Sequence, residues 1–387
     1  EELEAENPRV ASLARYVDQK GNYPIYRNST VEYFPLGEDK FKRLVEELKK
    51  AEHFIFMEYF IVAEGYMWDT VREILVQKVK EGVEVRFMYD GTCMIKLLPY
   101  SYPEYLESLG IKCKVFGPIR PALSTVQNNR DHRKIVVIDG RIGYTGGMNI
   151  ADYYINGLPK IGTWRDMHIR IEGPAVDILQ EIFLTIWNKT TKQNIAGEVY
   201  FPERPAPADS TDGITVAIVD RTPKKDPRML SHTYAMSIYA AKENVRIVNP
   251  YFVPTSSIRK ALNHALEKGT KVEIMISSKS DIPFTPDASL YKVHKLMKRG
   301  ADIYLYNGGF HHSKIMMVDE TFCTVGTANL NSRSLRYDYE TNAFIFNKEF
   351  TAQLDSVFQA DTQHCTRLTP EVWKQRSPWK KFVGWFA

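Results

Sequence analysis

Two stretches of the sequence decide the fold, HRKIVVID at residues 132–139 and HSKIMMVD at residues 312–319. Both fit one pattern, HxKxxxxD, in which four apolar residues separate a His/Lys pair from an aspartate. The apolar residues predict a short buried strand. Because side chains two positions apart on a strand point to the same side, the histidine and the lysine share one face. Each stretch therefore places a proton-transfer group beside a fixed positive charge.

The pattern recurs at equivalent places, which composition alone does not explain. One chance match in a chain of this length is expected on the order of 0.03 times. Downstream, Asn149 in YTGGMN and Asn329 in VGTAN each lie seventeen residues after the motif histidine. Equal spacing indicates equal geometry, so we interpret the two stretches as copies of one site element.

Strand and helix signals around the motifs also repeat in the same order. Apolar strand-like runs alternate with helical stretches that end at glycine, and each run of the first half has a counterpart in the second. The first-half runs are FIFMEYFIV (54–62), EGVEVRFMYD (81–90) and LGIKCKVF (109–116), and their counterparts are VRIVNPYFVP (245–254), KGTKVEIMI (268–276) and RGADIYLY (299–306). This pattern predicts an α/β fold with two similar domains, each a β-sheet flanked by helices.

A stretch rich in Pro, Asp and Ser, YFPERPAPADSTDG, separates the two halves and has no periodicity. We expect an N-terminal domain over residues 1–199, a linker over 200–213, a C-terminal domain over 214–370 and a tail over 371–387. The tail, EVWKQRSPWKKFVGWFA, interleaves aromatic and cationic residues. Such a mixture suits a bilayer interface, and it equally suits a segment that fills a groove in the protein.

Composition sets broad limits on the class of protein. With 387 residues, 44% hydrophobic and 25% charged, the chain is globular, neither disordered nor fibrous. The net charge of +4 tolerates anionic partners without requiring them. The four cysteines contain no CxxC pair and are expected to be reduced and buried. The most apolar run, from Phe54, is strand-sized and includes Glu58, so we expect any membrane anchor to lie outside this sequence.

Two acidic residues follow the motifs at moderate distance, Asp166 in TWRD and Glu340 in YDYETN. A carboxylate on one ring nitrogen of a histidine fixes its tautomer and leaves the other nitrogen free for phosphorus or a proton. These acids are candidates for that role, and the alternative is that they are surface acids at strand edges. His311 is expected to point away from the face of His312, and the histidines outside the motifs are expected to be structural.

At these residues the sequence resembles the phospholipase D superfamily, whose signature is HxKxxxxD twice in one chain. The segments GGMNIADYY, WRDMHIRIEGPAV, VNPYFVP and HSKIMMVDETFCTVGTANLNSRSL are similar to the bacterial cardiolipin synthase branch. The sequence departs from that branch because it lacks the membrane-spanning N-terminal segment and carries Asn331 where an acid is common.

The resemblance implies two domains related by pseudo-two-fold symmetry, each with a mixed β-sheet, whose motifs face one cleft. It implies no metal and no other cofactor. By position it implies catalytic histidines at His132 and His312, phosphate-binding lysines at Lys134 and Lys314, phosphate-binding amides at Asn149 and Asn329, orienting acids at Asp166 and Glu340, and structural acids at Asp139 and Asp319. Arg333 and Arg336 are candidates for a second lipid phosphate, with surface ion pairs as the alternative.

The expected activity is that of a phosphatidyltransferase, which condenses two phosphatidylglycerol molecules to cardiolipin and glycerol through a phosphohistidine, with His132 favoured as nucleophile. Transfer to water, by a phospholipase or a nuclease of the same fold, remains the alternative, and an inactive scaffold is disfavoured by the two intact motifs. We expect phosphatidylglycerol and an anionic membrane surface as partners and no nucleic acid. The resemblance places the protein at the bacterial inner membrane, with the catalytic part facing the cytoplasm.

Overall fold

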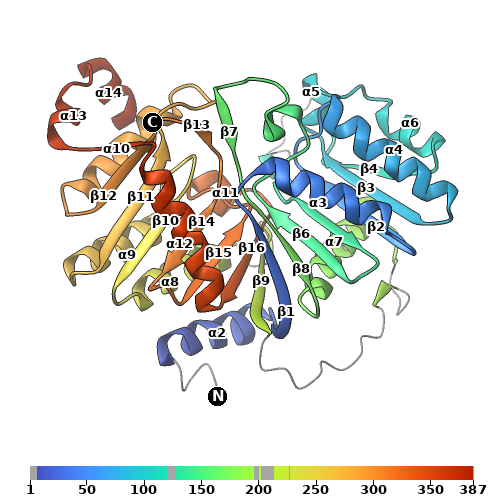
Figure 1. Ribbon diagram of the computed structural model, residues 1–387, viewed down its shortest axis with the longest axis horizontal. Coiled ribbons are helices and arrows are strands. Elements are labelled where there is room, and N and C mark those ends of the chain that lie inside the picture. The colour runs from blue at the N-terminus through green and yellow to red at the C-terminus, as the bar shows by residue number, and fades with distance from the viewer. Residues whose placement is uncertain (1–6, 120–127, 196–199, 202–212, 226, 387) are drawn as a thin grey trace.

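The computed structural model describes residues 7–119, 128–195, 200–201, 213–225 and 227–386. Its centre is one mixed 15-stranded sheet with the order β17-β12-β11-β10-β14-β15-β16-β9-β1-β8-β6-β5-β2-β3-β4. Helices cover both faces of this sheet (Figure 1). The expected α/β class is confirmed.

The first half supplies seven strands of this sheet. They are β1 (Ile25–Phe34), β2 (Phe54–Tyr59), β3 (Glu84–Asp90), β4 (Lys112–Phe116), β5 (Ile135–Ile138), β6 (Ile142–Gly146) and β8 (His168–Glu172). Around them lie α3 (Gly37–Lys49), α4 (Tyr66–Lys80), α5 (Cys93–Lys96), α6 (Tyr102–Ser108), the 3-10 helix η2 (Asp152–Ile155) and α7 (Val176–Thr191). The three strands β2, β3 and β4 are parallel, and β5 runs antiparallel to β2.

The second half repeats this arrangement. Its strands are β9 (Ile214–Arg221), β10 (Asn244–Val248), β11 (Lys271–Ser277), β12 (Asp302–Tyr306), β14 (Ile315–Val318), β15 (Phe322–Gly326) and β16 (Glu340–Phe346), with β17 (Cys365–Arg367) added at the edge. Its helices are α8 (Met229–Ala240), α9 (Ser256–Glu267), α10 (Thr285–Met297), α11 (Ser332–Arg336), α12 (Lys348–Thr362), α13 (Pro370–Lys374) and α14 (Pro378–Phe386). Read outward from the antiparallel β1–β9 pair, both halves have the same strand order, so a pseudo-two-fold axis passes between these two strands.

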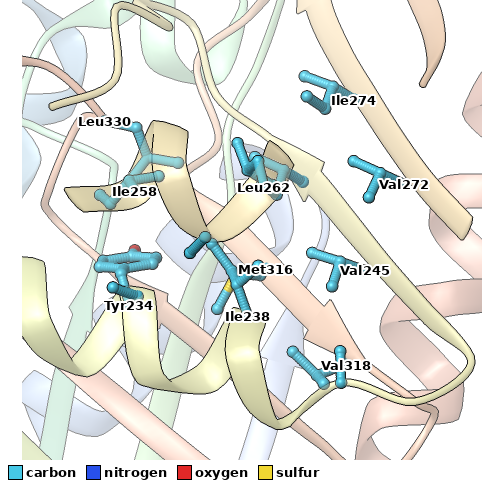
Figure 2. Packing of buried hydrophobic residues seen from close by; sticks show 14 of the residues in the cluster. Tyr234, Ile238, Val245, Ile258, Leu262, Val272, Ile274, Met316, Val318 and Leu330 are labelled. Atoms are coloured by element: carbon cyan, nitrogen blue, oxygen red, sulfur yellow. The ribbon is translucent and has the colours of Figure 1, made fainter. Parts of the chain in front are cut away.

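Apolar side chains between helices and sheet hold each half together. In the second half, α8 and α9 press Tyr234, Ile238 and Leu262 onto strand residues such as Val245 and Met316 (Figure 2). These side chains are at most 1% exposed. Fully burying each of these side chains stabilises the fold by about 1.5–3 kcal/mol. This packing fixes the position of each helix on the sheet.

The motif aspartates close the turns after β5 and β14. Asp139 and Asp319 both adopt the left-handed conformation with φ of 53°, which aspartate tolerates better than most residues. The Asp139 carboxylate accepts hydrogen bonds from the backbone N–H groups of residues 52, 53 and 54, at 2.7–2.9 Å. Asp319 does the same for residues 242, 243 and 244. Each aspartate thus joins its turn to the start of a neighbouring strand.

The ends of the chain both pack on the second half. Helix α2 (Pro8–Gly21) lies against α8 and contributes Leu13 and Val17 to the second-half core. The boundary at 200–213 stays a prediction, since residues 202–212 lie outside the described part of the chain. None of the described helices is both long enough and apolar enough to span a bilayer.

Candidate active site

Each motif histidine is tied by its backbone to the other half of the chain. His132 lies just before β5, and its N–H donates to the carbonyl oxygen of Tyr339 at 3.1 Å. His312 lies just before β14, and its N–H donates to the carbonyl oxygen of Arg165 at 2.7 Å. The second contact extends a two-stranded sheet in which β7 (Thr163–Arg165) pairs with β13 (Gly309–His311). These crossings bring both motifs to the junction between the halves.

The side chains of the histidines also pair across the halves. His132 Nδ1 lies 2.9 Å from a carboxylate oxygen of Glu340, and His312 Nδ1 lies 2.6 Å from Asp166 Oδ2. Both carboxylates are fully buried. A carboxylate on Nδ1 holds the proton there and leaves the lone pair on Nε2. The sequence singled out both acids. It did not show that each acid contacts the histidine of the other half, because this contact depends on the tertiary structure and not on the spacing of the motifs.

The motif lysines lie under the histidines and are fully buried. Lys134 donates to the backbone oxygen of His132, and Lys314 Nζ lies 2.8 Å from Nδ1 and 3.0 Å from Nε2 of His312. Burial lowers the pKa of Lys134 to about 7, against the opposing effect of Glu340. Burial lowers the pKa of Lys314 to about 8, against the opposing effect of Asp166. Both ammonium groups are therefore poised to bind an anion that replaces the water they have lost.

One electrostatic field covers the two motifs. Burial, and then the positive charges of Lys134 and Lys314, lower the pKa of His132 well below its ordinary value. The pKa of His312 is lowered well below its ordinary value in the same way, by burial first and by Lys314, with Lys134 and His132 adding to the effect. Burial raises the pKa of Asp166 to about 6. Burial and the two lysines thus both favour the neutral form of each imidazole.

The two motif asparagines differ in their surroundings. Asn149 is committed to the protein, since its Oδ1 accepts from the N–H of Ile61 at 3.0 Å and its Nδ2 donates to the Tyr154 hydroxyl at 2.8 Å. Asn329 is 6% exposed, and its Oδ1 has no hydrogen-bond partner among the described residues. Equal spacing in the sequence did not reveal this difference. The Asn329 amide is the freer of the two to reorient toward a ligand.

The rings around the histidines are also unequal. His312 is surrounded by aromatic rings, with centroids 5.3 Å from Trp164 and 5.8 Å from Tyr154, and Tyr251 and Phe310 lie nearby. His132 has Phe60 at 4.9 Å. The position two before the orienting acid is Trp164 in the first half and Asp338 in the second.

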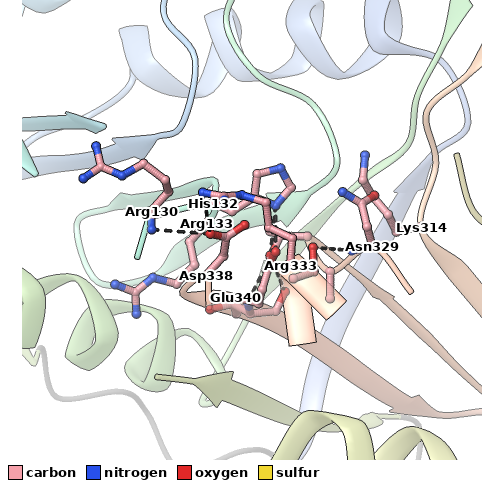
Figure 3. Close-up of polar contacts among 12 residues, drawn as sticks. Arg130, His132, Arg133, Lys314, Asn329, Arg333, Asp338 and Glu340 are labelled. Carbon is pink, nitrogen blue, oxygen red and sulfur yellow. Dashed lines mark hydrogen bonds and ion pairs between the residues drawn. The ribbon is translucent and has the colours of Figure 1, made fainter. Parts of the chain in front are cut away.

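Charged side chains occupy the His132 side instead. Asp338 is buried and forms an ion pair with Arg333 at 3.5 Å, and it also accepts from the N–H of Arg130 (Figure 3). Arg333 donates to the backbone oxygen of Asn128 at 3.0 Å. Arg336 is exposed at the end of α11. The structure thus brings Arg333, but not Arg336, into contact with residues around His132.

Arg133 lies between the motif His and Lys in the sequence. Its side chain points away from their shared face and into a buried ionic network. Its guanidinium lies 3.0 Å from Glu58, 3.0 Å from Asp131 and 3.1 Å from Asp220. Asp220 belongs to β9, so this network joins the two halves below the site. Sequence reasoning did not single out Arg133, because nothing local shows that three acids from distant segments converge on it.

His311 points away from the motif face, as the sequence indicated. Its Nε2 lies 3.0 Å from Asp361 on α12. Among the residues that the structure describes, no three His, Cys, Asp or Glu side chains are grouped so as to hold a metal ion. The motif site is therefore built from imidazole, ammonium, amide and carboxylate groups.

The fold and the paired motifs define the class of two-motif phospholipase D-like proteins. The chain belongs to the cardiolipin synthase family, since the profile described as "Cardiolipin synthase, PLD-like domain" matches residues 44–187 and 234–362. It is 36% identical over 361 residues to the major cardiolipin synthase of Bacillus subtilis (strain 168), covering 92% of this chain and 74% of that protein. It is 35% identical over 364 residues to a cardiolipin synthase of Oceanobacillus iheyensis, covering 94% of this chain and 75% of the relative.

Solved structures share the fold at lower identity. The crystal structure of phosphatidylserine synthase from Haemophilus influenzae Rd KW20 matches with a TM-score of 0.72 at 15% identity, over 97% of each chain. Polyphosphate kinase from Porphyromonas gingivalis matches with a TM-score of 0.58 at 12% identity, over 89% of this chain and 49% of that one. At these identities the likeness concerns the fold alone.

Proposed function

We propose that the protein is a cardiolipin synthase, which transfers a phosphatidyl group from one phosphatidylglycerol to the glycerol headgroup of a second and releases glycerol. The observation that carries this proposal is the pair of histidines, each held by a buried carboxylate from the other half and each beside a buried lysine, in a chain whose relatives include named cardiolipin synthases. Two nitrogen lone pairs beside two ammonium groups suit a double displacement at a phosphodiester.

In the first step, Nε2 of His132 attacks phosphorus, a P–N bond forms and the bond from phosphorus to the glycerol oxygen breaks. The departing oxygen takes a proton from His312. Burial and Lys314 favour neutral His312 in the free protein. A bound phosphodiester anion raises the pKa of this imidazole, so that it takes up a proton from water before the step and serves as the general acid. We assign attack to His132 from the family resemblance, since neither histidine is distinguished by its distance to its acid.

In the second step, neutral His312 removes the proton from a hydroxyl of the incoming phosphatidylglycerol. That oxygen attacks phosphorus, the P–N bond breaks, and cardiolipin leaves with His132 restored. One diester replaces another, so the two steps need little net driving force. Lys134 and Lys314 stabilise the charge on the non-bridging oxygens, with Asn329 and the second Nδ2 hydrogen of Asn149, the one that does not bond to Tyr154, as the amide donors of the same site. No cofactor takes part in this scheme.

The His132 side carries the group suited to the second lipid. We assign the phosphate of the incoming lipid to Arg333, because a guanidinium can bind phosphate through two parallel hydrogen bonds and this one lies at the edge of the site. Arg336 would assist only from the exposed end of α11. We also propose that the catalytic part acts at the cytoplasmic face of a bacterial inner membrane, which the free cysteines of the chain support.

A product assay tests the reaction. The protein is incubated with phosphatidylglycerol in mixed micelles, and cardiolipin, phosphatidic acid and glycerol are followed by mass spectrometry. Cardiolipin with equimolar glycerol is the expected result. Phosphatidic acid without cardiolipin would show transfer to water instead, and cleavage of oligonucleotides alone would refute the lipid assignment.

A trapping experiment tests the order of the histidines. With phosphatidylglycerol that carries radiolabelled phosphate, His312→Ala should slowly accumulate labelled protein, because His132 can still form the P–N bond with water as the acid, whereas no base remains to activate the incoming hydroxyl. His132→Ala should remain unlabelled. His264→Ala, at an exposed histidine on α9, is the matched control and should behave as wild type. Label on His132→Ala alone would reverse the two roles.

A further inference from the structure

Exposed apolar side chains gather on one edge of the molecule. Because β2 and β3 are parallel, the segments that follow their carboxyl ends emerge at the same edge of the sheet, and the same holds for β10 and β11. These segments expose Tyr66, Ile95, Tyr100, Ile282 and Phe284, and Leu158 is exposed just after η2. We call these side chains, together with the exposed face of α14, the apolar rim. Since β5 and β14 run antiparallel to their neighbours β2 and β10, the histidines before them lie at this edge too.

Helix α14 has its aromatic face turned to solvent. Trp379, Phe382, Trp385 and Phe386 are 69%, 50%, 59% and 80% exposed, and neighbouring rings among them are in contact. The spacing of three to four residues places them on one side of the helix. A surface helix of a globular protein ordinarily buries such a side. This orientation indicates that a partner outside the chain covers it.

The opposite side of α14 is fixed to the body of the protein. Gly384 lies so close to α10 that a Cβ atom there would sit 2.3 Å from the backbone oxygen of Asp287. Just before α14, Trp373 stacks on His294 with ring centroids 3.8 Å apart, and Arg376 forms an ion pair with Asp287. Of the two alternatives for the tail, docking on the protein holds for Trp373 and Gly384, while the rings of α14 stay outside.

Cationic side chains surround this face. Lys374 and Lys380 are exposed, and Lys381 lies over the ring of Trp373 at 5.8 Å. Acidic residues are absent from 372–386. Aromatic rings at headgroup depth with lysines that meet phosphate are the chemistry of an anionic lipid interface. The excess of cations beside the rings favours such a surface over an uncharged protein partner.

We propose that the apolar rim is the surface by which this protein binds an anionic phospholipid bilayer, with α14 as the element that enters the headgroup layer. The inference rests on the proposed function in one respect, because an enzyme that acts on lipids needs the edge that carries the motifs to face the bilayer. Figure 1 shows α13, α14 and α5 along the upper edge of the molecule, with α8, α9 and α2 at the opposite one. A membrane at the upper edge presents its headgroups to the motif site.

The test is vesicle binding by the full chain. Sedimentation with vesicles of phosphatidylglycerol and phosphatidylcholine is compared with sedimentation with phosphatidylcholine alone. The double variant Trp379→Glu/Phe386→Glu should reduce binding to the anionic vesicles by about tenfold or more, because it removes two inserted rings and adds two repelled charges. Tyr239→Glu is the matched control, since Tyr239 is a 44% exposed aromatic at the end of α8, at the opposite edge.

Activity in mixed micelles separates this inference from the proposed function. The double variant should keep wild-type transfer in micelles and lose it on vesicles, while His132→Ala should bind vesicles as wild type does and make no cardiolipin. Undiminished vesicle binding by the double variant would overturn the inference. So would a wild-type dimer in light scattering that the double variant dissociates without any change in vesicle binding, because the rings would then cover a second copy. A second variant, Gly384→Leu, should displace α14 and weaken vesicle binding without adding charge.

Discussion

Replacing Lys134 with methionine should stabilise the fold while it abolishes the reaction. Burial lowers the pKa of the Lys134 ammonium from 10.5 to about 7, which means that the folded protein holds this proton less tightly than the unfolded chain does. A group whose pKa is lowered by folding destabilises the folded state most at low pH, where it is protonated in both states. This free-energy cost declines as the pH rises toward the pKa of the group in the unfolded chain. Methionine has a similar length and no charge, so the variant avoids this cost.

The magnitude follows from the shift of the pKa. The penalty is at most about 4 kcal/mol at pH 7 and about 2 kcal/mol at pH 9. The hydrogen bond from Lys134 to the backbone oxygen of His132 is lost in the variant, which offsets about 1 kcal/mol of the gain. We therefore expect Lys134→Met to be about 3 kcal/mol more stable than wild type at pH 7, with an advantage that shrinks toward pH 9.

Urea unfolding followed by tryptophan fluorescence at pH 6, 7, 8 and 9 measures this advantage. Lys114→Met is the control, because that lysine on β4 is half-buried in a solvent-accessible ion pair with Glu107, and its removal should change stability by no more than about 0.5 kcal/mol at any pH. The electrostatic account is refuted if Lys134→Met is less stable than wild type at pH 7, or if its advantage is the same at every pH. Cardiolipin formation by this variant should be below detection throughout.

Four further outcomes are expected. Arg133→Met should destabilise the fold by about 3–5 kcal/mol in urea unfolding, because the buried carboxyl groups of Glu58, Asp131 and Asp220 lose the guanidinium that they share; a neutral effect would mean that this guanidinium contributes no net stability. Asp139→Ala should cost about 2–3 kcal/mol by the same measurement with kcat unchanged, since it frees three backbone donors far from the reaction; a large loss of kcat in folded protein would give this aspartate a direct role. Glu340→Gln should lower kcat about 10²- to 10⁴-fold. Since burial raises the pKa of Glu340 to about 7, wild-type kcat should fall as pH drops below that value, and the Gln variant should lack this limb of the pH profile. EDTA should leave the rate of transfer unchanged, and a rate restored by added Mg²⁺ would contradict the proposed role of the lysines.

Local patterns sufficed to predict much of the fold. The apolar four-residue runs after Lys134 and Lys314 are the buried strands β5 and β14, because a strand covered on both faces needs a continuous apolar sequence. The strand and helix order of each half was visible for the same reason. The pairing of β1 with β9 was not predicted, because the sequence of a strand does not indicate which distant strand it pairs with, and these two are separated by nearly half the chain.

The site divides in the same way. Residue types and spacing singled out the histidines, lysines, asparagines and acids, and their catalytic roles stay predictions. The identity of the acid beside each histidine depends on the crossing of β7 and β13, a tertiary contact. The aromatic side chains around Trp164 and the charged side chains around Asp338 were not predicted, because the repeated pattern contains only the residues that the two halves share. A comparison of the two repeats position by position would have revealed that difference.

Because each histidine contacts an acid of the other half, neither half contains both members of an acid–histidine pair. Glu340 serves a histidine more than 200 positions earlier in the chain, and Asp166 serves one on the far side of the pseudo-two-fold axis. A short ancestral protein with a single motif could assemble such a centre only by associating with a twin along the seam that β1 and β9 now form.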